Sequence, residues 1–191
     1  MKPAAFVAVL DACVLYPAPL RDLLMWLALS GQFRARWSED IHREWKTNLL
    51  NNRPDLLQAQ VDRTAQLMDQ AIPGALVKGY EPLISGLDLP DENDRHVLAA
   101  AICSRANVIV TFNLKDFPRA TVQAFGIKAK HPDDFLHDLI QLDASAVTLA
   151  ARRQRLHLKN PEISTNEYLE VIGNLGMPKT LIALSSMRLL L

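Results

Sequence analysis

The sequence has few cysteines and no long apolar run, and both absences narrow the class of protein that it encodes. Only two cysteines occur among 191 residues, Cys13 and Cys103, and their separation excludes a Cys-x-x-Cys zinc or redox motif. We expect each to be a small buried apolar residue. No run approaches the ~18 apolar residues of a membrane helix, and Asp11 interrupts the first apolar run too early for a signal peptide. A soluble cytoplasmic protein without a membrane partner is therefore expected.

The chain also lacks an excess of charge of either sign. Lysine and arginine together number 21, aspartate and glutamate together number 21, and the net charge is zero. This balance disfavours a protein that grips nucleic acid by overall positive charge, although a local basic patch or a bound cation remains compatible with it. Hydrophobic residues make up 49% of the chain, which is enough for a packed core. The length suggests one domain with a small appendage.

Short apolar runs alternate with helical patterns over the first two thirds of the chain. This alternation predicts an α/β fold with a mainly parallel sheet covered on both faces. We predict strands at residues 6–10, 33–37, 75–78, 108–111 and 126–130. We predict helices at residues 19–31, 39–50, 55–72 and 89–107, the second with Ser38 as its N-cap and the last with Asp91.

After His131 the pattern becomes wholly helical. Ser164 and Glu167 have the spacing of a capping box at the start of one of these helices. We therefore divide the chain into an α/β domain, residues 1–132, and a C-terminal helical extension, residues 133–191. The extension is predicted to contain helices at residues 132–143, 145–158, 164–176 and 178–191.

Four acidic residues have positions that predict a common site. Asp11 directly follows the first strand, and Asp116 follows the strand at 108–111. Ligands of open parallel sheets bind beyond the carboxyl ends of the strands, where these two acids meet. Asp94 and Glu44 lie beside the apolar stripes of two helices, and a buried carboxylate needs a cation or hydrogen bonds. Four acids around one crevice predict a site for Mg²⁺ or Mn²⁺.

Each of these side chains also has a purely structural interpretation. Asp94 has the spacing of a capping box with Asp91, and Glu44 has the position of a solvated helix residue. Turn formation alone accounts for the remaining polar residues, Asp11, Asn113 and Asp116. The joint order of the acids along the chain, rather than any one of them, favours the metal site.

The segments that carry these acids occur in an order that resembles the motif order of a known family. An apolar strand ends in Asp (VAVLDACVLYP), and a Ser-initiated helix carries Glu (WSEDIHREW). An Asp-led, Ala-rich helix follows (DENDRHVLAAAI), and a strand then ends in Thr-x-Asn and Asp-Phe (VTFNLKDF). Over about residues 5–132 this series resembles the PIN-domain nucleases, and within them the toxin ribonucleases of bacterial VapBC-type toxin–antitoxin pairs.

The resemblance implies a three-layer α/β/α sandwich and a Mg²⁺- or Mn²⁺-dependent endoribonuclease. It implies RNA as the substrate, a cognate antitoxin as the protein partner, and a homodimer as a further assembly. Ser38 and Thr111 match supporting hydroxyl positions, and the implied metal ligands are Asp11, Glu44, Asp94 and Asp116. The helical tail resembles the C-terminal extension of one subgroup of these toxins.

The chain departs from the family pattern at the last ligand. Many members carry an acid two residues after the threonine, where this chain has Asn113. Asp116 stands one residue later than in the commonest form. Asn113 can bind a metal through its carbonyl oxygen but contributes no charge, so either residue can complete the site.

Two other functions remain open from the sequence. The first is a metal-dependent phosphohydrolase, although aspartate-based chemistry usually requires a second Asp two residues after the first, where this chain has Cys13. The second is a catalytically inactive PIN fold that binds RNA or protein.

The surroundings of the acids are less informative. We expect Trp26, Trp37 and Trp45 to lie in the core and His96 to have a structural role. Five cations flank the acid motifs and can line the rim of an RNA site, although each is more simply a solvated surface residue: Arg43, Lys46, Arg95, Lys115 and Arg119.

Overall fold

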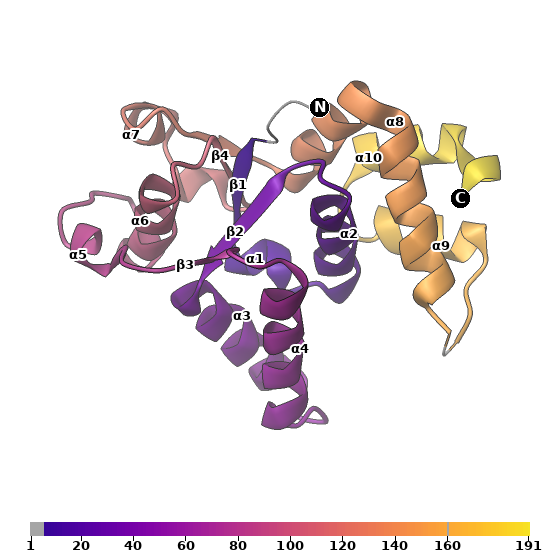
Figure 1. The fold of residues 1–191 in the computed structure, drawn as a ribbon, viewed down its shortest axis with the longest axis horizontal. Helices are drawn as coiled ribbons and strands as arrows, with labels where there is room; N and C mark the ends of the chain where they lie inside the picture. The colour runs from indigo at the N-terminus through magenta and orange to yellow at the C-terminus, as the bar shows by residue number, and fades with distance from the viewer. Residues whose placement is uncertain (1–5, 160) are drawn as a thin grey trace.

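Five parallel strands form the central sheet of the computed structural model, which describes residues 6–159 and 161–191 (Figure 1). The first five residues of the predicted α/β domain and Asn160 lie outside the described residues. The strand order is β3-β2-β1-β4-β5, and every neighbouring pair is parallel. The strands are β1 (Val7–Leu10), β2 (Arg34–Ser38), β3 (Leu76–Val77), β4 (Val108–Val110) and β5 (Lys128–Lys130).

All five predicted strands are therefore confirmed, with ends shifted by a few residues. The centre of the sheet is β1 and β4, whose side chains from Ala8 to Leu10 and from Val108 to Val110 are buried. Strands that are buried on both faces consist of continuous apolar runs, and these runs made the strands recognisable in the sequence.

Helices cover both faces of this sheet. Figure 1 shows α6 on one side of the strands and α2 on the other, which confirms the three-layer α/β/α arrangement. The helices of the α/β domain are α1 (Ala12–Leu15), α2 (Ala18–Leu29), α3 (Glu39–Asn52), α4 (Gln58–Ala71), α5 (Glu81–Ile84), α6 (Arg95–Cys103) and α7 (Arg119–Gln123). Three of these, α1, α5 and α7, were not predicted, because helices of four or five residues are too short to show a period of 3.6.

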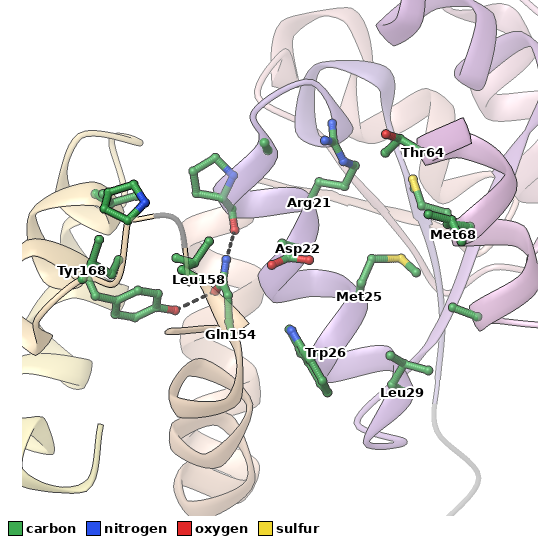
Figure 2. Close-up of a pocket in the computed structure, with 17 residues that line it drawn as sticks. Arg21, Asp22, Met25, Trp26, Leu29, Thr64, Met68, Gln154, Leu158 and Tyr168 are labelled. Atoms are coloured by element: carbon green, nitrogen blue, oxygen red, sulfur yellow. Dashed lines mark hydrogen bonds between the residues drawn. The ribbon is translucent and has the colours of Figure 1, made fainter. Parts of the chain in front are cut away.

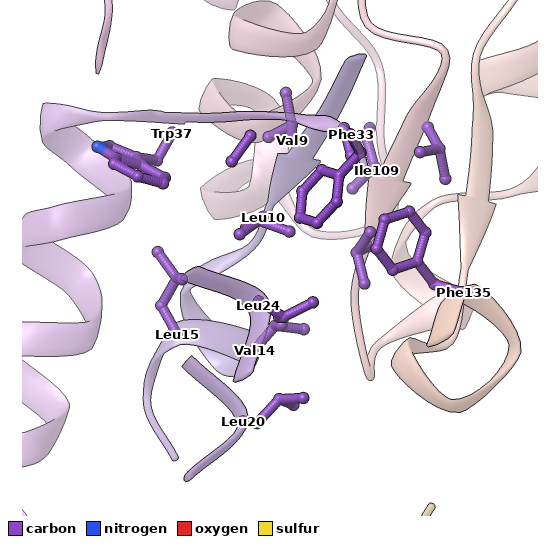
Figure 3. Close-up of a cluster of buried hydrophobic side chains, with 14 of the residues drawn as sticks. Val9, Leu10, Val14, Leu15, Leu20, Leu24, Phe33, Trp37, Ile109 and Phe135 are labelled. Carbon is purple, nitrogen blue, oxygen red and sulfur yellow. The ribbon is translucent and has the colours of Figure 1, made fainter. Parts of the chain in front are cut away.

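The core lies between the sheet and α2 and extends to the C-terminal helices. Figure 3 shows Leu10 and Ile109 of the strands in one cluster with Leu24 of α2 and Phe135 of α8 (Pro132–His157). The rings of Phe33 and Phe135 meet edge to face, with their centroids 5.1 Å apart. This contact joins the α/β domain to the extension.

The helix predicted at 89–107 begins later than expected. Residues Glu92–Asp94 form a short 3₁₀ helix, η1, and α6 begins at Arg95. Asp91 accepts a hydrogen bond from the backbone N–H of Asn93 (2.9 Å), and Asp94 makes no side-chain capping bond. The capping-box interpretation of Asp91 and Asp94 is therefore wrong, and the Asp94 carboxylate is not used to cap the helix.

The extension contains α8, α9 (Thr165–Gly173), α10 (Pro178–Ser186) and a final 3₁₀ turn, η3 (Arg188–Leu190), beside α2 (Figure 1). The break between the two helices predicted at 132–143 and 145–158 is confirmed at Asp143, whose backbone is not helical (φ −156°, ψ 81°), and both helices lie within the span labelled α8. The predicted capping box of Ser164 and Glu167 is confirmed. Asp133 of α8 is buried and accepts bonds from the N–H and hydroxyl of Thr180, both 2.8 Å long, which fixes the start of α10.

Two predictions about burial need correction. Cys103 is exposed at the end of α6, where its thiol donates to the carbonyl of Lys78 (3.4 Å), so it is not a core residue. Trp37 and Trp45 are fully buried as predicted, whereas Trp26 is only half-buried and lines a cavity. Helical spacing places Trp26 on the side of α2 that faces the extension, which the sequence of α2 alone does not reveal.

Candidate functional site

Asp11 is the most firmly held acid of the candidate site. It follows β1, caps α1 and is 2% exposed. One carboxylate oxygen, Oδ1, accepts a bond from the N–H of Ala12 (2.7 Å). The other, Oδ2, accepts from the hydroxyl of Thr111 (2.7 Å) and from the thiol of Cys13 (3.1 Å). Three donors thus fix the orientation of a carboxylate at the carboxyl end of the central strand.

The sheet register explains why these groups meet. Leu10 of β1 pairs with Val110 of β4, and the N–H of Asp11 donates to the carbonyl of Val110 (3.1 Å). The next residue of each chain segment therefore lies at the same edge, which brings Thr111 to Asp11. Thr111 is fully buried, so its supporting position is occupied as the sequence predicted.

Burial raises the pKa values of both Asp11 and Cys13. It raises the pKa of the Asp11 carboxyl above its ordinary value, against the lowering effect of its hydrogen bonds to Thr111 and Cys13. Burial and the neighbouring Asp11 charge raise the pKa of the Cys13 thiol to about 12. Cys13 therefore stays protonated at neutral pH and acts as a donor to the carboxylate. The sequence analysis treated Cys13 only as a small core residue and missed this contact.

The charges of the other acids act on Asp94. It is half-buried at the junction of η1 and α6, and burial is the largest cause that raises its pKa to about 7. The charges of Asp11, Asp91, Asp116 and Glu44 raise it further, in that order. The fold thus brings all four predicted acids from four separate segments within electrostatic range of one another.

Glu44 is positioned through α3. Ser38 is fully buried and its hydroxyl accepts a bond from the N–H of Ile41 (3.2 Å), which caps the helix that carries Glu44. Oε2 of Glu44 lies 3.4 Å from Nε2 of His96. His96 is thus a neighbour of the site, and the signal for it was its place two residues after Asp94.

Asn113 and Asp116 follow β4 as predicted but differ in their surroundings. Asp116 ends the 3₁₀ turn η2 (Leu114–Asp116), is half-buried, and acts electrostatically on Asp94. Asn113 is exposed, and its backbone N–H donates to the hydroxyl of Thr111 (2.9 Å). Asp116 thus acts on Asp94 through its charge, and the backbone of Asn113 contacts Thr111, which in turn donates to Asp11.

The donor set fits a hard divalent cation. The acids offer carboxylate oxygens without a thiolate, and Asp94 carries repulsion from like charges that a cation would relieve. Within residues 6–159 and 161–191, no three His, Cys, Asp or Glu side chains stand close enough together to form a complete ligand cluster. The carboxylates therefore share one edge of the sheet without forming a ready-made cluster of three ligands among the described residues.

The predicted basic rim is only partly available. Three of the five cations, Arg43, Lys46 and Arg95, form ion pairs with neighbouring carboxylates. Lys115 and Arg119 are exposed and have no ion-pair partner among the described residues. Free cations near the acids therefore lie on the side of the site toward η2 and α7.

One cavity lies away from these acids. It has a volume of about 560 Å³ and lies between α2, α4 and the extension (Figure 2). Figure 2 shows Gln154 bridging the carbonyl of Pro19 (2.7 Å) and the hydroxyl of Tyr168 (2.8 Å) along its wall. None of the four acids lines it, so this cavity is separate from the candidate site. Among the described residues, no helix is both long enough and apolar enough to cross a membrane.

Comparisons with known proteins agree with this arrangement. The family described as "PIN domain" matches residues 7–115, and the family described as "VapC50 C-terminal domain" matches residues 132–186. A curated protein of Mycobacterium tuberculosis (strain ATCC 25618 / H37Rv), named "Putative ribonuclease VapC50", is 39% identical over 99 residues, which cover 52% of this chain and 58% of that protein. The chain thus spans less than two thirds of the length of this relative. No solved structure matches the chain significantly. Because the PIN match covers more than half of the chain and contains four of the five strands of the parallel sheet, the chain belongs to the PIN-domain family.

Proposed function

We propose that the chain is a divalent-metal-dependent endoribonuclease that hydrolyses RNA phosphodiester bonds. The observation that carries this proposal is the convergence of Asp11, Glu44 and Asp116 on Asp94, whose pKa is raised to about 7 by burial and then by these neighbouring charges. The PIN family match and the printed name of the curated relative support it.

We further propose that the chain is the toxin of a type II toxin–antitoxin pair, with RNA as its substrate in the cytoplasm and a cognate antitoxin as its partner. The match of residues 132–186 to the VapC50 C-terminal domain supports this assignment. In this proposal, residues 1–132 are the nuclease domain and residues 133–191 the helical extension.

The four acids would hold Mg²⁺ or Mn²⁺, with Asn113 as an additional candidate ligand. Such an ion stabilises negative charge on the phosphate and lowers the pKa of a bound water. The donor chemistry supports a hard cation of this kind, since all four acids offer carboxylate oxygens.

The residues of the chain supply position and orientation. Thr111 and Cys13 hold the Asp11 carboxylate in one rotamer, and Ser38 fixes the helix that carries Glu44. The Asp94 side chain makes no capping hydrogen bond at the start of α6. Pre-oriented ligands of this kind raise metal affinity, because little side-chain entropy is lost when the ion binds.

The proposal is tested by the cleavage of end-labelled RNA with purified protein in Mn²⁺, Mg²⁺ or EDTA. Asp94→Asn is the test variant and Glu170→Gln, an exposed acid on α9, is the matched control. We expect discrete fragments with metal, none with EDTA, and at least a hundredfold slower cleavage by Asp94→Asn, since catalysis depends on the metal. Absence of metal-dependent cleavage would favour the inactive binding module, and equal cleavage by Asp94→Asn would contradict the assigned site.

A further inference from the structure

The cavity between α2, α4 and the extension has a wall that is mostly apolar. Met25 and Leu29 of α2, Leu67 and Met68 of α4, and Ile163 of the extension all contribute to it. Leu29 and Leu67 stay about half exposed, so the cavity is open at one side. Its volume of about 560 Å³ lies within the range of about 300–1,000 Å³ that is typical of small-ligand sites. The cavity can therefore hold the apolar body of a small organic molecule.

Several hydrogen-bonding side chains of this wall already have partners within the protein. Gln154 bridges the carbonyl of Pro19 and the hydroxyl of Tyr168 (Figure 2). The hydroxyl of Thr64 donates to the carbonyl of Gln60 (3.1 Å). These polar groups are satisfied without a ligand.

The positive charge of Arg21 in the same wall is also engaged. Its guanidinium donates to the carbonyl of Leu15 (2.7 Å) and lies over the ring of Trp45, 4.9 Å from the ring centroid. Figure 2 shows the Arg21 side chain directed toward Thr64 of α4, whereas Asp22 lies on the side of α2 that faces Gln154. Arg21 therefore does not pair with the neighbouring Asp22, although its charge lowers the pKa of that carboxyl.

Asp22 is an acid of this wall that lacks a partner. Among the described residues, its carboxylate makes no hydrogen bond and no ion pair. It is exposed, so a ligand can reach it, yet desolvation by the surrounding protein still raises its pKa. A cation that paired with this carboxylate would relieve that desolvation cost.

An aromatic ring stands beside this carboxylate. Trp26 follows Asp22 by four residues on α2, so the two side chains share one face of the helix, and both line the cavity (Figure 2). The indole is only half-buried and offers a ring face to the cavity side. A carboxylate next to an indole attracts an ammonium group by ion pairing and by the cation–π interaction.

We propose that this cavity binds a small organic ammonium ion with an apolar body. The ammonium group lies between the Asp22 carboxylate and the indole of Trp26, and the apolar body packs against Met25, Leu67 and Met68. The proposal goes beyond the ribonuclease function and does not depend on it, because none of the four acids of the candidate site lines this cavity.

The test compares three compounds that share a phenyl ring and a butyl chain and differ in charge. They are 4-phenylbutylammonium, the neutral 4-phenylbutanol and the anionic 4-phenylbutyrate, and their affinities for the whole chain are measured by calorimetric titration at neutral pH. Asp22→Asn and Trp26→Leu are the test variants. Asp88→Asn is the matched control, since Asp88 is fully exposed and does not line the cavity. Thermal melts of all variants monitor folding.

We expect the wild type to bind 4-phenylbutylammonium about tenfold more tightly than 4-phenylbutanol, because only the ammonium pairs with Asp22 in a partly solvated site. Asp22→Asn should abolish this difference and leave the affinity for 4-phenylbutanol unchanged. Trp26→Leu should weaken the binding of the ammonium about threefold more than that of the alcohol, through loss of the cation–π interaction. Asp88→Asn should alter neither affinity.

Four results would overturn the proposal. The wild type could bind none of the compounds, or bind the ammonium no more tightly than the alcohol. The preference for the ammonium could persist in Asp22→Asn. Tighter binding of 4-phenylbutyrate than of the other two compounds would assign the cavity to an anion held by Arg21. If Asp22→Asn does not fold, the ranking of the three compounds on the wild type and on Asp88→Asn decides the question alone.

Discussion

Replacing Asp94 by asparagine should stabilise the metal-free protein at neutral and alkaline pH. The pKa of this carboxyl is raised from its ordinary value of 3.8 to about 7, chiefly by burial and then by the neighbouring acids. At 1.36 kcal/mol per pKa unit, the folded state would lose about 4 kcal/mol when Asp94 ionises. Asp94 is only half-buried, and screening by solvent reduces this to about 2 kcal/mol.

The sign of the pH dependence follows from proton linkage. A carboxyl whose pKa is raised on folding binds more protons in the folded state, so stability falls as pH rises from about 4 to about 7 and is then level. The Asp94→Asn variant lacks this fall. The difference between variant and wild type should therefore be small at pH 4 and reach its full value near pH 8.

The assay is a series of thermal melts in EDTA from pH 4 to pH 8. A gain of about 2 kcal/mol raises the Tm by about 4–8 °C for a chain of this length. Asp88→Asn is the matched control, because the Asp88 side chain is fully exposed and should leave the Tm unchanged. A variant with a Tm equal to or below that of the wild type at pH 8, or a difference that grows toward low pH, would refute the reasoning.

The remaining predictions concern metal affinity and the extension. Thr111→Val removes the 2.7 Å bond to Asp11 and should weaken Mn²⁺ binding by about tenfold in calorimetric titration, and an unchanged affinity would contradict its supporting role. Mn²⁺ affinity should fall as pH is lowered from 7 to 6, by up to about tenfold, because a proton competes for Asp94, whereas a flat profile would show that Asp94 is not a ligand. Asp133→Ala removes two bonds to Thr180 and should lower the free energy of unfolding by about 2–4 kcal/mol in urea titration, and a loss below about 0.5 kcal/mol would contradict the proposed anchoring of α10.

The strands and the long helices were predictable because buried positions in such elements carry apolar residues in a recognisable pattern. The five apolar runs marked the sheet, and their alternation with helices indicated that it is parallel. Helices of four or five residues are too short to show such a pattern, so α1, α5 and α7 were not predicted. The predicted break near Asp143 was confirmed, because the Asp143 carboxylate accepts a bond from the N–H of Ala146 (2.9 Å) and so competes with continuation of the helix.

The candidate site was predictable in its acids but not in their contacts. Positions after strands and beside apolar stripes identified Asp11, Asp94, Glu44 and Asp116 without knowledge of their distances. The bond from Cys13 to Asp11 and the contact of His96 with Glu44 depend on how separate elements pack, which no local pattern encodes. Cys103 was placed in the core because free cysteines are often buried, a general tendency that does not locate one residue on α6.

The account depends most on a shared metal site at the carboxyl edge of the sheet. The most direct measurement is anomalous diffraction from crystals of the wild-type protein soaked in Mn²⁺. We predict an anomalous peak within about 2–2.5 Å of carboxylate oxygens of Asp11 and Asp94, a distance typical of oxygen ligands of hard divalent cations. A peak elsewhere on the molecule, or none at saturating Mn²⁺, would contradict the assignment of these acids to one centre.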